Sequence, residues 1–139
     1  MKDAIASLER KLAGRSYLGL LFLRLFIGVR LFYGVIDNIL SWEQMIEFSS
    51  FLESFGFPLP VISAVVSVYV QFLGSLAILF GFKIRIASFF IAINFLIAMM
   101  MVHIPAGDTF EAMTPPLAML FGATTFLFLG AGKIAVEKD

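Results

Sequence analysis

YLGLLFLRLFIGVRLFYGVIDNIL, residues 17–40, decides the fold class, because it is apolar along almost its whole length. The hydrocarbon core of a bilayer is about 30 Å thick, and a helix needs about 20 mostly apolar residues to cross it. The segment also contains two arginines and has no obvious small-residue cleavage site. We therefore expect a permanent spanning helix here rather than a cleaved signal peptide.

Three further apolar segments follow, each separated from its neighbour by turn-forming residues. Hydrophobic residues make up 60% of the 139-residue chain and charged residues only 14%, which is unlike a soluble domain. Glycine and proline interrupt the apolar pattern at residues 56–60, 81–85 and 105–108. The sequence therefore predicts an all-α integral membrane four-helix bundle, whose second to fourth helices cover residues 61–82, 86–103 and 116–129.

The loop after the first span carries the signature of a short additional helix. Ser41 and Gln44 have the spacing of a capping box, with Ser41 as the N-cap. Trp42, Met45 and Leu52 then share one helical face, as expected for a helix lying at the outer interface. We divide the chain into a basic N-terminal segment (1–16), a four-helix domain (17–133) and a tail (134–139).

Basic residues are distributed on one side of this predicted topology. The N-terminal segment, the loop around residue 84 and the C-terminal tail contain eight of the ten lysines and arginines. The two opposite loops contain none and carry glutamates and an aspartate. Because basic loops remain in the cytoplasm, we expect a multi-pass protein with both termini cytoplasmic.

Composition also excludes several kinds of chemistry. The chain has no cysteine, which removes disulfides, thiol redox chemistry and thiolate-held clusters. Its one histidine argues against a haem or metal site built by this chain alone. The formal net charge is zero, and nothing in the pattern indicates nucleic-acid binding. We expect no metal site and no intrinsic cofactor.

Polar residues inside the apolar segments are the candidate ligand-binding residues. A charged residue at the centre of a spanning helix costs about 2.5–3.5 kcal/mol on insertion scales, so such residues are functional candidates. Arg30 lies near the middle of the first segment, and Asp37 follows it two turns later. Gln71 and Asn94 lie at a similar depth in the second and third segments. We expect Arg30, Gln71 and Asn94 to face one interior region, with Arg30 hydrogen-bonded.

Two further candidates and one alternative stay open. Arg24 either joins this site or extends toward the cytoplasmic interface. His103, at the outer end of the third segment, either relays protons or is a solvated interfacial residue. The alternative for the buried amides and serines is helix packing, because small and polar residues at spacings of three and four hold membrane helices together.

Several short motifs together resemble the DoxX family of small bacterial four-helix membrane proteins. The resemblance covers residues 17 to 133, with motifs at 23–28, 32–34, 56–60, 79–85, 98–103 and 130–132. Asp37 and Gln71 depart from it, since the family often has a lysine and a glutamate there. The resemblance implies a bacterial cytoplasmic membrane and a link to membrane redox, because relatives are associated with thiosulfate:quinone oxidoreduction.

Three functional hypotheses follow. The first is a redox-linked subunit that binds quinone or a similar lipid-soluble molecule, with Arg24, Arg30, Asp37, Gln71, Asn94 and His103 as ligand-binding candidates. If the protein is part of an enzyme, that enzyme is a quinone-linked oxidoreductase, whose electrons come from a partner or directly from a substrate. The second is a structural subunit of a larger membrane complex, and the third is a small-solute binder or carrier. Expected partners are the lipid bilayer, other membrane or redox subunits, or further copies of the chain.

Overall fold

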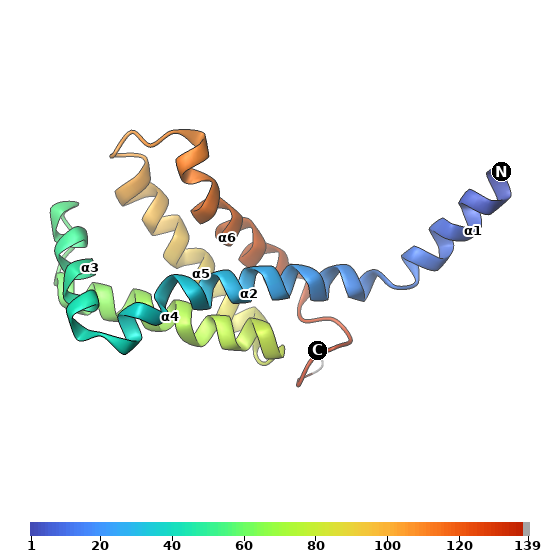
Figure 1. Cartoon of the computed structure of the whole chain (residues 1–139), viewed down its shortest axis with the longest axis horizontal. Coiled ribbons are helices and arrows are strands. Elements are labelled where there is room, and N and C mark those ends of the chain that lie inside the picture. Colours follow the sequence, from blue (N-terminus) through green and yellow to red (C-terminus); the bar gives the residue numbers. More distant parts are fainter. Residues whose placement is uncertain (138–139) are drawn as a thin grey trace.

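The computed structural model describes residues 1–137, and every regular secondary-structure element among them is a helix (Figure 1). Residues 138–139 of the predicted tail lie outside the described part. In chain order the helices are α1 (Lys2–Ala13), α2 (Ser16–Leu40), α3 (Trp42–Ser54), α4 (Pro60–Phe80), α5 (Ile84–Ala98), the π-helical η1 (Met99–His103) and α6 (Phe110–Leu129).

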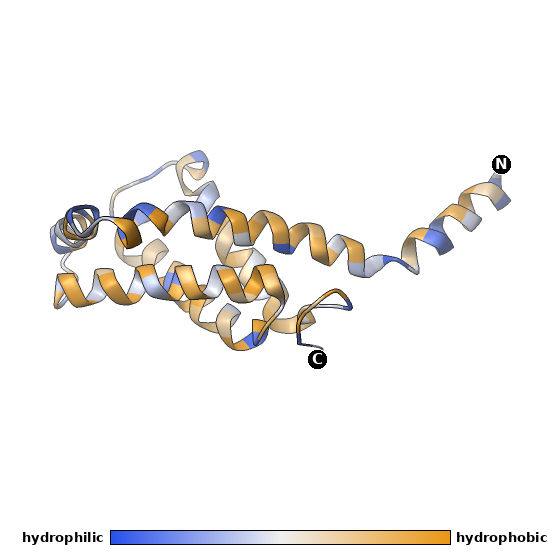
Figure 2. Ribbon diagram, turned by 60° about the horizontal axis from the view of Figure 1, so that its bottom comes forward, coloured by the Kyte–Doolittle hydropathy of each residue, from blue (hydrophilic) through white to orange (hydrophobic). Residues whose placement is uncertain are grey.

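Four of these helices form the membrane domain, as the hydropathy pattern predicts. Within the described residues, the helical stretches Ser16–Leu40, Pro60–Phe80, Ile84–His103 and Phe110–Leu129 are long and apolar enough to cross a bilayer. Apolar residues cover most of their outer surface (Figure 2). In this part of the chain α2 packs against α4, α4 against α5, α5 against α6, and α6 returns to α2.

Glycines allow these helices to approach closely. A Cβ atom on Gly28 of α2 would lie 2.6 Å from Cγ of Leu79 on α4. A Cβ atom on Gly122 of α6 would lie 2.6 Å from Cδ1 of Ile27 on α2. Small residues therefore set the spacing between the spanning helices, as is usual in membranes, where packing replaces the hydrophobic effect between helices.

The start of α2, the end of α4 and the segment after α6 lie together at one end of the bundle, which we call the terminal end. There Nζ of Lys133 lies 5.0 Å above the ring of Tyr17. The backbone N–H of Val136 donates to the carbonyl of Phe80 at 2.9 Å. Lys83 and Glu137 form an exposed ion pair at 2.8 Å, and the hydrogen bond and charge of Glu137 raise the pKa of Lys83. The opposite end, with α3 and the loop after η1, is the distal end.

The extra helix predicted after the first span is present as α3. The Ser41 hydroxyl accepts a hydrogen bond from the N–H of Gln44 at 3.4 Å, which confirms the N-cap. Met45 and Leu52 are buried, and α3 packs against α4. Trp42, predicted on the same face, is instead 62% exposed. The location of α3 at a membrane interface remains a prediction.

Two boundaries differ from the sequence-based expectation. The last span begins at Phe110 rather than Pro116, because the Thr109 hydroxyl accepts from the N–H of Ala112 and caps the helix earlier. The N-terminal segment, expected only as a basic stretch, forms α1.

Candidate functional site

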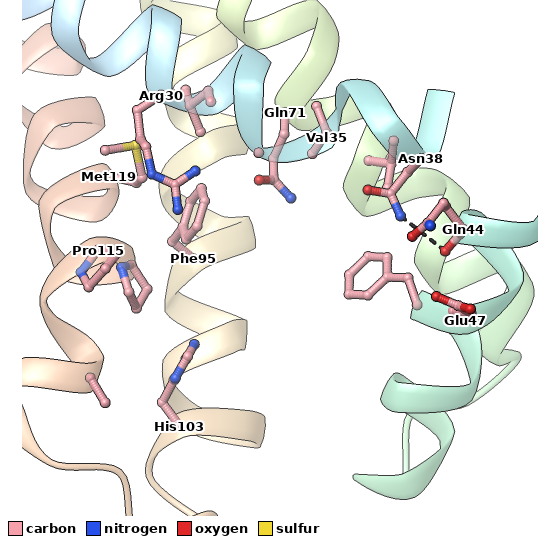
Figure 3. A pocket seen from close by; sticks show the side chains of 16 residues that line it. Arg30, Val35, Asn38, Gln44, Glu47, Gln71, Phe95, His103, Pro115 and Met119 are labelled. Carbon is pink, nitrogen blue, oxygen red and sulfur yellow. Dashed lines mark hydrogen bonds between the residues drawn. The ribbon is translucent and has the colours of Figure 1, made fainter. Parts of the chain in front are cut away.

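The candidate site is a cavity of about 650 Å³ in the distal half of the bundle, here called the Arg30 cavity (Figure 3). Five parts of the fold form its wall: α2, α3, α4, the α5–η1 stretch and α6. Its lining mixes polar groups with apolar side chains: Arg30, Leu31, Gly34, Val35, Asn38, Gln44, Glu47, Phe48, Val68, Gln71, Phe95, His103, Ala112, Pro115, Pro116 and Met119.

Arg30 supplies the positive charge of this cavity. Its side chain extends from α2 into the space between Phe95 and Met119 (Figure 3). Gly34, one turn later, leaves room for it, since a Cβ atom there would lie 2.8 Å from Nη1 of Arg30. No residue among 1–137 forms a hydrogen bond or ion pair with the guanidinium. Arg30 thus has no protein partner among these residues, and its expected hydrogen bond stays a prediction.

A hydrogen-bonded chain of three side chains links α4 to α5 beside the cavity. Nε2 of Gln71 donates to the hydroxyl of Ser67 at 3.2 Å, and that hydroxyl donates to Oδ1 of Asn94 at 2.7 Å. Gln71 lines the Arg30 cavity and Asn94 does not. The structure therefore brings Arg30 and Gln71 together and places Asn94 one step behind them.

Asn94 instead lines a second cavity of about 540 Å³, here called the apolar cavity. Four residues line both cavities and so separate them: Phe48, Gln71, Phe95 and His103. The remaining lining is mostly apolar and comes from α3, the 55–59 loop, α4, α5 and η1: Phe51, Leu52, Phe57, Pro58, Ile62, Ser63, Val66, Ser67, Asn94, Ile97, Ala98, Met101 and Val102.

His103 lies at the distal end of both cavities and is paired with an acid. Its Nδ1 is 2.8 Å from Oδ2 of Asp108, in the loop that follows η1. Both side chains are partly exposed, so the pair connects the cavity to the surface. A carboxylate on Nδ1 leaves Nε2 as the ring atom available to a ligand or water.

Two polar residues of α3, Gln44 and Glu47, line the cavity and are not among the candidates named from the sequence. Nδ2 of Asn38 donates to the carbonyl of Gln44 at 3.1 Å, which ties the end of α2 to α3. Glu47 lies across the cavity from Arg30 and is exposed (Figure 3). The sequence predicted a helix with one apolar face at the outer membrane interface, but not that this face packs over the distal half of α2 and α4.

Arg24 has a different environment. It is 1% exposed and donates to the carbonyls of Ile78 (2.9 Å), Leu79 (3.0 Å), Ala131 (3.1 Å) and Ile134. These carbonyls lie at the end of α4 and in the segment after α6, at the terminal end. Arg24 thus satisfies acceptors that a helix end leaves open, and it lies outside both cavities.

Asp37 also lies outside both cavities and is exposed on α2. Of the six residues singled out from the sequence, Arg30, Gln71 and His103 line one cavity, and Asn94 lines its neighbour together with Gln71 and His103. In residues 1–137 no cluster of three or more His, Asp or Glu side chains is placed to hold a metal ion.

The fold and the site define an integral membrane protein with four spanning helices and an arginine-containing cavity among them. The DoxX family model matches residues 19–104, which is more than half of the chain, and the protein belongs to the DoxX family. Comparisons with curated proteins and with solved structures find no match. Arg30, Gln71, Asn94 and His103 lie inside the matched segment, whereas the α6 wall of the cavity lies beyond it.

Proposed function

We propose that this protein binds a lipid-soluble carbonyl compound of the quinone class, with the ligand's polar head against Arg30. The observation that carries the proposal is a guanidinium at the middle of a spanning helix that faces a cavity and has no partner in residues 1–137. A charge in this position is costly unless a ligand or water solvates it. A ligand with acceptor oxygens would supply the missing hydrogen bonds.

The chemistry of the cavity supports a carbonyl head group. An arginine donates two parallel hydrogen bonds and stabilises negative charge as it develops on oxygen. Gln71 adds an amide near the same space, and Phe95 offers an aromatic surface for a flat ring. The apolar cavity behind Gln71 and Phe95 supplies a route for an isoprenoid tail.

Electron transfer, on this proposal, depends on a partner. The sequence has no cysteine and one histidine, so the chain offers no thiolate ligands and no pair of histidines for a haem. We therefore assign to it the positioning and polarisation of the ligand within a redox-linked membrane assembly. His103 and Asp108, which pair at 2.8 Å at the distal surface, would on this proposal exchange a proton between the cavity and water.

A small polar solute is the second candidate ligand. Asn38, Gln44 and Glu47 give the mouth of the Arg30 cavity a polar rim, which a purely lipid-soluble ligand does not need. Such a ligand would carry an anionic group for Arg30 and would not use the apolar cavity.

We also propose that the terminal end faces the cytoplasm of a bacterial cell, with the protein in the cytoplasmic membrane. Lys83, Arg85 and Lys133 join the four basic residues of positions 1–15 at this end, and the distal loops carry acidic residues instead. That asymmetry follows the rule that basic loops are retained inside.

The test is ligand binding to the full chain in nanodiscs. Short-chain and long-chain ubiquinone and menaquinone analogues would be titrated and followed by native mass spectrometry and thermal shift. We expect binding by the wild type, at least about tenfold weaker binding by Arg30→Leu, equivalent to about 1.4 kcal/mol, and an intermediate affinity for Arg30→Lys. Arg15→Leu is the matched control, because it removes an exposed arginine outside both cavities.

Unchanged quinone affinity in Arg30→Leu would overturn the proposal. Binding of small anions such as sulfite or acetate that depends on Arg30, without any quinone binding, would favour the second candidate.

A further inference from the structure

Helix α1 carries an apolar stripe that nothing in the described chain covers. Ile5, Leu8 and Leu12 are 51%, 56% and 62% exposed, and no residue of α1 is buried. The helix extends away from the bundle beyond the start of α2 (Figure 1). An exposed row of aliphatic side chains of this kind usually marks an interaction surface.

The charges on α1 are arranged around this stripe. At 3.6 residues per turn, Met1, Ile5, Leu8 and Leu12 fall within an arc of about 60°. Lys2 and Lys11 each lie about 90° from the centre of that arc, on opposite sides. Hydrophilic and hydrophobic residues alternate along the helix accordingly (Figure 2). Long lysine side chains at both margins of an apolar face can reach lipid phosphates while the face itself enters the acyl region.

The connection to α2 keeps this helix close to the bilayer. Gly14 and Arg15 alone separate α1 from the first spanning helix. The Gly14 N–H donates to the carbonyl of Arg10 at 3.1 Å, and the Arg15 N–H donates to the carbonyl of Leu12 at 2.9 Å. A linker this short keeps the last turn of α1 beside the point where α2 enters the membrane.

We infer that α1 is an interfacial helix that lies on the membrane leaflet at the terminal end and binds anionic lipid headgroups. Residues 1–15 contain four basic and two acidic side chains, which complements a negatively charged leaflet. A second copy of α1 is a poorer occupant than an anionic leaflet, because each copy carries the same excess of basic over acidic side chains.

The absence of native cysteine makes a site-specific test direct. Ile5→Cys and Ser7→Cys would each be labelled with an environment-sensitive fluorophore in the full chain. The two positions lie about 160° apart on α1, so they report on opposite faces. Emission wavelength and quenching by aqueous iodide would be measured in nanodiscs of pure phosphatidylcholine and in nanodiscs rich in phosphatidylglycerol.

We expect the Ile5 label to shift to the blue and to be shielded from iodide in anionic nanodiscs, while the Ser7 label stays accessible. Adding Lys2→Gln and Lys11→Gln should make the emission and the iodide quenching of the label at position 5 the same in both lipid compositions. Equal accessibility of the two labels in anionic nanodiscs would overturn the inference, as would equal shielding at position 5 in both lipid compositions. Shielding in lipid-free detergent with cross-linking between chains would show that a second copy covers the stripe instead. These readouts require no ligand, so they are independent of the proposed quinone site.

Discussion

Arg24 and Arg30 lie on the same spanning helix, yet the first donates four hydrogen bonds to protein carbonyls and the second donates none within residues 1–137. Arg24 contacts four carbonyls at the terminal end, whereas Arg30 extends into the cavity of the distal half. They are six residues apart, so they leave α2 in directions separated by about 120°. Arg24 therefore links α2 to α4 and to the segment after α6, whereas Arg30, on the proposed function, binds the ligand.

This division predicts different effects on stability. Arg24→Met should lower the free energy of unfolding by about 3 kcal/mol or more, because it leaves several buried carbonyls without a donor. Arg30→Met removes no protein hydrogen bond and should change it by less than about 1 kcal/mol. Thermal unfolding in one detergent, followed by circular dichroism, compares the two variants with the wild type.

Arg24→Lys adds a control, because it keeps the charge but cannot reach carbonyls of α4 and of the segment after α6 at the same time. The free energy of unfolding of Arg24→Lys should lie between those of the wild type and Arg24→Met. Equal destabilisation by Arg24→Met and Arg30→Met would contradict the structural role of Arg24.

The apolar cavity predicts a variant that discriminates between ligands by tail length. Ala98→Phe adds a ring to the lining of this cavity and leaves the Arg30 cavity unaltered. It should weaken binding of a long-tailed quinone about tenfold, equivalent to about 1.4 kcal/mol, and leave a quinone with a truncated tail unaffected. Ala87→Phe, on the same helix but outside both cavities, is the control. If Ala98→Phe weakens the binding of the long-tailed and the truncated quinone equally, the tail does not occupy this cavity.

The proposed orientation predicts which surface residues a membrane-impermeant thiol reagent can reach in intact cells. Single cysteines replacing Ser50 on α3 or Ala106 in the loop after η1 should be labelled without lysis. A cysteine at Ala4 or Lys83 should be labelled after lysis alone, because the terminal end faces inward. Labelling of Ala4→Cys in intact cells would reverse the topology.

Hydropathy and local capping were sufficient to predict the framework of this fold. Four long apolar segments of this length can cross a bilayer only as helices, and the Ser41 cap acts within one turn of chain. The partners of Arg24 could not be predicted in this way. They are carbonyls 54 to 110 residues away in the sequence, and every residue type carries a carbonyl. Helical periodicity predicted the apolar face of Met45 and Leu52 on α3, but which helices that face packs against depends likewise on tertiary packing.

The sequence pattern also could not predict that His103 lies on the same face as Phe95, because this depends on a local change of helix geometry. Phe95 and His103 are eight residues apart and line the same two cavities. In a regular α-helix they would be about 80° apart around the axis. The π-helical turn Met99–His103, marked by the bond from the Ile104 N–H to the Met99 carbonyl at 3.0 Å, accommodates one extra residue. It therefore returns His103 to the face of Phe95.

This account of the π-turn predicts that one residue can be removed without loss of the fold. Deletion of Met100, which is 63% exposed, should convert η1 to regular α-helix and keep His103 on the same face as Phe95. The thermal stability should stay at or above that of the wild type, because i→i+4 hydrogen bonds replace the π-type bonds.

Deletion of Phe89, an exposed residue in the regular part of α5, is the control. It should cost about 2 kcal/mol or more, since it rotates the buried Ile91 away from Gly74. Thermal unfolding of both variants in detergent makes the comparison, and similar destabilisation by the two deletions would show that the π-turn does not act as a one-residue insertion.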